Sequence, residues 1–205
     1  LMLKTGLERW TRYGEEFGFG TKTGIDITEE TDGLLPSADY FDRVYGKGRW
    51  TQGYLVSLSI GQGEVGVSPL QMACYAAALG NKGYYHQPHV VEKIRDKETG
   101  EVEQVIGDTR RIDLSDRVWH DIHQGMIRCV NELGGTALTA RVQGVTVAGK
   151  TGTAQNPHGK DHAWFIGFAP ADHPRIAICV LVENAGFGGV VSAPTRPDRS
   201  SAPPP

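Results

Sequence analysis

The spacing of apolar residues changes along this chain, and that change most strongly limits the folds it can adopt. Near the start, apolar residues recur at steps of three and four, which predicts an amphipathic helix over residues 1–17. The residues on its expected core face are Leu3, Leu7, Trp10, Tyr13 and Phe17. In the last third, short apolar runs predict strands over residues 145–148, 163–168 and 176–182. Helices followed by neighbouring strands predict an α+β fold with an antiparallel sheet.

The region between these two patterns begins as a predicted loop and then carries a strong helix signal. Residues 18–53 are interrupted by repeated glycines, which favour turns. Residues 68–71 read Ser-Pro-Leu-Gln, a capping box with proline at the first helical position. A helix is therefore expected from there to Gly80.

Further along, the sequence predicts a hairpin, another helix and a disordered tail. Residues 89–106 contain two apolar runs around a turn that ends in Gly100, which is typical of a hairpin. Ser115 is placed to cap a helix that runs towards Gly134. Residues 195–205 are rich in proline and polar residues, and are expected to be disordered.

Composition and charge argue against several classes of protein. The 205 residues include 21 basic and 24 acidic side chains, for a formal net charge of -3, which does not suit a nucleic-acid-binding surface. The longest apolar run, residues 176–182, is far shorter than the ~20 residues of a membrane-spanning helix. Three cysteines, Cys74, Cys129 and Cys179, have apolar neighbours and are interpreted as buried free thiols.

Residues 144–151 fit the phosphate-binding pattern G-x-x-x-x-G-K-S/T, but their context argues against a nucleotide site. That pattern needs a strand before its first glycine and a helix directly after the serine or threonine. Here β-branched residues place the strand inside the loop itself, and the sequence that follows Thr151 does not favour a helix. No magnesium-binding aspartate follows on a second strand, and the nucleotide interpretation is disfavoured.

The same segment supports a different chemistry through Lys150-Thr151-Gly152-Thr153, expected at the end of a strand. Lys-Thr-Gly on a strand is the third signature of the penicillin-recognising serine acyltransferases. The lysine supplies positive charge, and the two threonine hydroxyls can hydrogen-bond a substrate carboxylate. Gly152 leaves room for a substrate backbone to lie along the strand, and a strand N–H can enter an oxyanion hole.

Other segments, in consistent order over residues 1–194, extend this resemblance. They are residues 24–27, 33–36, 58–63, 67–73, 135–137, 162–170 and 188–194, the last interpreted as the end of a final strand. The chain thus resembles the class B penicillin-binding proteins, and most of all the penicillin-binding protein 2 group of elongation-type peptidoglycan D,D-transpeptidases. This resemblance implies a β-lactamase/transpeptidase-like α+β fold, in which an antiparallel sheet packs with helices.

Two family motifs are missing from the sequence. No serine is followed by lysine three positions later, so the nucleophile motif S-x-x-K is absent. The second motif, S-x-N, is also absent, and Ser37-Ala38-Asp39 only imitates it. Residues 1–194 are therefore expected to be the C-terminal part of a transpeptidase domain, without its nucleophile, its membrane anchor or its closing helix.

For an intact relative, the resemblance implies a serine that attacks D-Ala-D-Ala stem peptides of peptidoglycan and that β-lactams acylate. Lys150 and Thr153 would be catalytic, with the Thr153 N–H in the oxyanion hole. Thr151, Gly152, Thr153 and Gln155 would contact the substrate. No cofactor is expected, because acyl transfer proceeds through a covalent serine intermediate.

The resemblance also implies a cellular location, and it leaves two alternative functions open. The domain would lie on the periplasmic side of the cytoplasmic membrane, beside a glycosyltransferase of the elongation machinery. The main alternative is a non-catalytic sensor or scaffold module that has lost the nucleophile, and a serine β-lactamase is a weaker one.

Three smaller candidates remain. His158, Asp161 and His162 suggest either a metal site or, preferably, a polar turn. Ser59 and Gln62 lie in the segment that resembles the family's active-site wall, although a structural turn is favoured for them. Thr136 is interpreted as a helix cap rather than as a catalytic residue.

Overall fold

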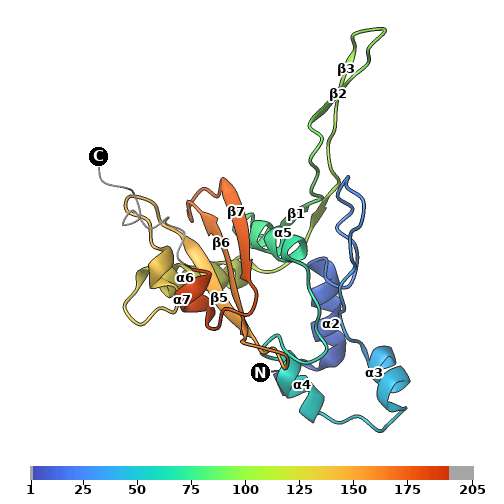
Figure 1. Cartoon of the computed structure of the whole chain (residues 1–205), viewed down its shortest axis with the longest axis vertical. Helices are drawn as coiled ribbons and strands as arrows, with labels where there is room; N and C mark the ends of the chain where they lie inside the picture. Colours follow the sequence, from blue (N-terminus) through green and yellow to red (C-terminus); the bar gives the residue numbers. More distant parts are fainter. Residues whose placement is uncertain (1, 194–205) are drawn as a thin grey trace. The chain divides into compact units, whose positions relative to one another are not determined.

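The computed structural model describes residues 2–193 and divides the chain into two compact units, up to Trp119 and from His120 (Figure 1). The predicted tail over residues 195–205 lies outside the described residues. No helix within residues 2–193 is both long enough and apolar enough to cross a membrane.

The first unit opens with two helices in place of the single helix expected over residues 1–17. Helix α1 is Met2–Thr5 and helix α2 is Leu7–Glu16. Gly6, which separates them, has a positive φ of 78°, a conformation that breaks helical geometry and that glycine adopts without steric cost. Leu7 is buried as expected, whereas Leu3 is exposed.

The loop predicted over residues 18–53 contains helix α3, Ala38–Tyr45, so that prediction was wrong. Ser37 caps this helix, because its Oγ accepts the Tyr40 N–H at 3.2 Å. Phe41 is fully buried within an aromatic cluster. Capping and aromatic packing thus outweigh the turn-forming glycines on either side. Helix α4, Gly53–Leu58, follows.

Helix α5, Pro69–Gly80, confirms the predicted capping box. The Ser68 side chain accepts the Gln71 N–H, and the Gln71 side chain accepts the Ser68 N–H in return. The Gln71 side chain is almost fully buried, and its Nε2 donates to the carbonyls of Thr21 and Asp32. One side chain therefore joins the start of α5 to a segment fifty residues earlier.

The predicted hairpin is confirmed, although its strands are short. Strand β2, Lys93–Arg95, pairs antiparallel with β3, Val102–Gln104, and both are exposed. The ribbon extends away from a second pair, β1 (Tyr84–His86) and β4 (Thr109–Arg111) (Figure 1).

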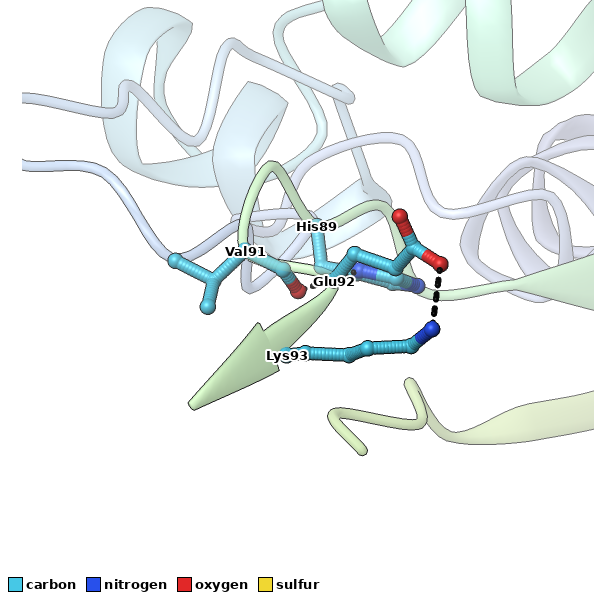
Figure 2. A network of polar contacts seen from close by, with 4 residues as sticks. All are labelled: His89, Val91, Glu92 and Lys93. Atoms are coloured by element: carbon cyan, nitrogen blue, oxygen red, sulfur yellow. Dashed lines mark hydrogen bonds and ion pairs between the residues drawn. The ribbon is translucent and has the colours of Figure 1, made fainter. Parts of the chain in front are cut away.

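Two exposed polar contacts lie where the chain enters the hairpin. The Val91 carbonyl oxygen lies 2.9 Å from His89 Nδ1, and Lys93 forms an ion pair with Glu92 at 3.5 Å (Figure 2).

Helix α6, Asp116–Asn131, begins after Ser115 as predicted, and the Ser115 Oγ accepts the Val118 N–H. Beyond α6, the second unit continues with the 3-10 helix η1, Leu138–Ala140. Its sheet follows the order β5 (Ala148–Ala154), β6 (His162–Ala169) and β7 (Ile176–Val182), antiparallel throughout.

Two predictions for this unit are corrected. The first strand occupies residues 148–154 rather than 145–148, because the β6 ladder pairs with each residue from Ala148 to Ala154. Val147 instead enters the core ahead of the strand. Residues 188–194, interpreted as the end of a strand, begin with helix α7, Gly188–Val191.

The core of the second unit lies between α6, η1, α7 and one face of the sheet. Phe165 on the central strand is fully buried at its centre. The other buried members of this core are Val130, Ala137, Ala140, Val147 and Ala193.

Candidate active site

Strand β5 carries the Lys-Thr-Gly-Thr segment in its middle, at the edge of the three-stranded sheet. Thr151 pairs with Phe165, so its side chain lies on the same face of the sheet as that core phenylalanine. Thr153 shares this face, because side chains alternate along a strand. Lys150 and Gly152 lie on the opposite face.

Lys150 is exposed, and its Nζ donates to the backbone carbonyl of Thr151 at 2.7 Å. The ammonium group therefore stays next to its own strand. The predicted placement of Lys150 on a strand is confirmed, but Lys150 lies in the interior of β5 rather than at its end.

The Thr153 hydroxyl is held by helix α7. Its Oγ1 accepts the backbone N–H of Gly188 at 3.3 Å. A Cβ on Gly188 would collide with the carbonyl oxygens of Gly152 and Trp164. Only glycine lets the first turn of α7 approach β5 this closely, and the sequence patterns did not anticipate this contact.

Thr151 contacts Thr136, whose interpretation as a helix cap was wrong. The η1 helix is capped at Ala137 without a side-chain hydrogen bond. Instead the Thr136 Oγ1 lies 2.7 Å from the Thr151 Oγ1 and 3.2 Å from the Cys129 Sγ. Gly135-Thr136-Ala137 belonged to the family resemblance, which was the available signal for this site.

The remaining candidates lie elsewhere. Gln155 is exposed just beyond the end of β5. His162 accepts the Asn184 N–H at its Nδ1, and no group of three potential metal ligands occurs within residues 2–193. In the first unit, Ser59 donates to the Val56 carbonyl in the turn after α4, in agreement with the favoured structural turn.

Two further features of the second unit bear on the phosphate-binding pattern. As predicted, no helix follows Thr151 directly; β5 continues to Ala154 instead. A pocket of about 620 Å³ is lined by Asn131 and residues 141–146. Its lining includes the first three residues of the pattern but no part of the Lys-Thr-Gly-Thr segment.

The cysteines are free thiols, but only Cys74 is buried, and Cys129 and Cys179 are half-buried. Burial raises the pKa of the Cys74 thiol. Burial also raises the pKa of Cys179 to about 11. Both thiols are therefore protonated at neutral pH and poorly nucleophilic.

Comparison with known proteins shows the family to which this chain belongs. The sequence profile of the penicillin-binding protein transpeptidase domain matches residues 1–198. The chain belongs to this family. The peptidoglycan D,D-transpeptidase MrdA of Acinetobacter baumannii is 34% identical to this chain. The matched region covers 94% of this chain and 30% of that protein. The chain spans about a third of the length of the curated relatives it matches.

Solved penicillin-binding proteins have the same fold. The structure of Pseudomonas aeruginosa PBP2 in complex with WCK 5153 matches with a TM-score of 0.80 and 36% identity, over 93% of this chain and 41% of that one. Helicobacter pylori PBP2, in a complex with MreC, matches with a TM-score of 0.76 and 27% identity, over 94% of this chain and 36% of that one. The predicted resemblance to the penicillin-binding protein 2 group and the transpeptidase-like α+β fold are confirmed.

Proposed function

We propose that this chain forms the C-terminal part of a peptidoglycan D,D-transpeptidase domain, and that β5 lines its active site. The observation that carries the proposal is the Lys-Thr-Gly-Thr segment on an edge strand, with both threonine hydroxyls on one face. An edge strand can pair with an extended peptide substrate. The serine nucleophile is supplied from outside these 205 residues, in an S-x-x-K motif.

In the proposed reaction, the serine oxygen attacks the carbonyl carbon of the D-Ala-D-Ala bond and releases the terminal D-alanine. The acyl group then passes to the amine of a second stem peptide, which frees the serine. The Thr153 N–H stabilises the oxyanion of each tetrahedral intermediate. β-Lactams acylate the same serine. Neither reaction requires a cofactor, because the acyl group is carried by the serine itself.

Each residue of the segment has a proposed role. Lys150 supplies positive charge and supports proton transfer near the nucleophile. Thr151 and Thr153 bind the substrate carboxylate, Gly152 lets the substrate backbone approach the strand, and Gln155 contacts the substrate farther along.

The proposed setting is the periplasmic face of the cytoplasmic membrane, where stem peptides are cross-linked. The partner we infer is a glycosyltransferase of the elongation machinery. The resemblance to the MrdA transpeptidase supports this setting.

The test is the second-order rate of acylation of the full-length protein by benzylpenicillin. We expect Lys150→Ala to slow acylation by about 100-fold or more, the scale of losing one oxyanion donor. Thr153→Ala should be milder, at about tenfold, because the backbone N–H remains. Lys160→Ala, which alters an exposed lysine in the turn after β5, is the matched control.

Circular dichroism would verify that each variant is folded, as expected for the exposed Lys150. A folded Lys150→Ala variant that is acylated at the wild-type rate would refute the assignment of β5 to the active site.

A sensor or scaffold module remains the second candidate, because no serine of this chain lies in S-x-x-K. The full-length sequence separates the two proposals. An S-x-x-K motif with S-x-N upstream favours the enzyme, and the lack of both favours the sensor.

A further inference from the structure

The Thr136 hydroxyl lies between a thiol and the strand that carries the proposed carboxylate-binding residues. Its Oγ1 is 2.7 Å from Thr151 Oγ1 and 3.2 Å from Cys129 Sγ. Cys129 belongs to α6, Thr136 to the segment after it, and Thr151 to β5. Three elements of the second unit thus meet in one line of hydrogen-bonding groups.

The backbone around Thr136 is fixed by close packing. The Ala137 N–H donates to the Cys129 carbonyl at 3.0 Å, and the Ala137 side chain is fully buried. A Cβ on Gly135 would collide with the same Cys129 carbonyl. On the other side, a Cβ on Gly189 would collide with the Thr136 carbonyl oxygen. The position of Thr136 relative to β5 is therefore set by its neighbours.

The protons in this line of groups can run in two directions, because either atom of each pair could be the donor. Each hydroxyl has one proton to donate, and a thiol is a weak donor. If the Cys129 thiol donates to Thr136 and Thr136 donates to Thr151, the Thr151 proton is left for another acceptor. In the reverse order, the Thr151 hydroxyl donates its only proton to Thr136. It then presents only oxygen lone pairs to a substrate, and these repel an anion.

We propose that Thr136 is a positioning residue, which donates to Thr151 and so directs the Thr151 hydroxyl proton towards the substrate carboxylate. This inference rests on the proposed transpeptidase function. It goes further by adding a residue outside the Lys-Thr-Gly-Thr segment and by stating which substrate group that residue serves.

The test compares two ligands in the full-length protein: benzylpenicillin, which has an ionised carboxylate, and its methyl ester, which does not. Thr136→Val keeps the shape of the side chain and removes its hydroxyl. We expect it to slow acylation by benzylpenicillin about tenfold, as for a hydrogen bond to a charged group, and to slow acylation by the ester less than about twofold.

Three further variants complete the design. Thr136→Ser retains the hydroxyl and should restore acylation by benzylpenicillin. Thr146→Val removes the hydroxyl of another exposed threonine in the same unit and should have no effect. In a Thr151→Val background, Thr136→Val should cause no additional loss, because the group it positions is gone.

Equal losses on the two ligands would mean that Thr136 has only a structural role, and would overturn the inference. So would an unchanged rate in Thr136→Val, or additive losses in the double variant. If benzylpenicillin fails to acylate the wild-type protein, the proposed function itself fails and this inference fails with it.

Discussion

The backbone N–H of Gly188 donates to the hydroxyl of Thr153 across 3.3 Å, and this contact joins helix α7 to the strand of the candidate site. The Gly188 carbonyl oxygen also forms a hydrogen bond, because it accepts the buried Ser192 hydroxyl at 2.8 Å. Gly188 also contacts the backbone of two strands, with no space for a Cβ against the Gly152 and Trp164 carbonyl oxygens. The position of the Thr153 side chain thus depends on a glycine that no catalytic motif includes.

Gly188→Ala should therefore destabilise the protein, because the added methyl group forces α7 away from β5. We expect a loss of about 1–3 kcal/mol, the usual cost of overpacking, measured by urea unfolding of the full-length protein. Gly125→Ala is the matched control. Gly125 lies in α6 with open space around its Cβ position, so alanine there should stabilise by about 0.5–1 kcal/mol. Equal effects of the two substitutions would contradict this account.

Local signals were enough to predict several elements of this fold. The capping box at Ser68 and the cap at Ser115 are confirmed, because each motif satisfies backbone N–H groups within one helical turn. Helix α3 was missed, since its stability depends on Phe41 packing in an aromatic cluster that includes Trp50. The boundaries of β5 were misplaced because its pairing with β6, and not its own β-branched residues, decides where the strand begins.

The candidate site was predictable only in part, for a similar reason. Lys150 to Thr153 are adjacent in sequence, and their placement on a strand follows from a local pattern. Thr136 and Gly188 reach the same strand from 15 and 35 residues away. Such contacts are set by the packing of η1 and α7, which residue spacing does not encode.

Asp26 gives the first unit a dependence on acid pH. Its two carboxylate oxygens accept the N–H groups of Val90 and Val91 at 2.7 and 2.8 Å. These hydrogen bonds hold the pKa of Asp26 below its ordinary value of 3.8. The carboxylate therefore stabilises the folded state fully above that value, and this contribution is lost as the pH falls through the lower pKa of the folded protein.

Asp26→Asn should increase hydrogen exchange at the Val90 and Val91 amides at neutral pH, where the wild type is protected. Acidification from about pH 5 to pH 2 should then lower the protection of these amides, measured as exchange relative to the intrinsic rate at each pH, in the wild type but much less in the variant. Asp113→Asn, which changes an exposed aspartate elsewhere in this unit, is the control. The same acid response in wild type and Asp26→Asn would exclude this carboxylate as its source.

The phosphate-binding pattern over residues 144–151 should not bind nucleotide. Thr151 continues into β5 instead of opening a helix, so the backbone N–H groups that would cradle a phosphate are not presented at a helix N-terminus. Isothermal titration calorimetry with ATP and magnesium should show no binding. Micromolar binding that disappears in Lys150→Ala would overturn both this interpretation and the transpeptidase proposal.

The 205-residue chain by itself should not form a covalent adduct with a fluorescent penicillin. Acylation requires a serine whose hydroxyl is activated by a nearby lysine, as in S-x-x-K. None of its serines has that spacing, so the proposed acyl transfer needs a nucleophile from outside these residues. A denaturing gel should therefore show no labelled band for this chain, while the full-length protein is labelled stoichiometrically. Stoichiometric labelling of a serine within these residues, located by mass spectrometry of the labelled peptide, would place the nucleophile here and contradict the proposed division of the site.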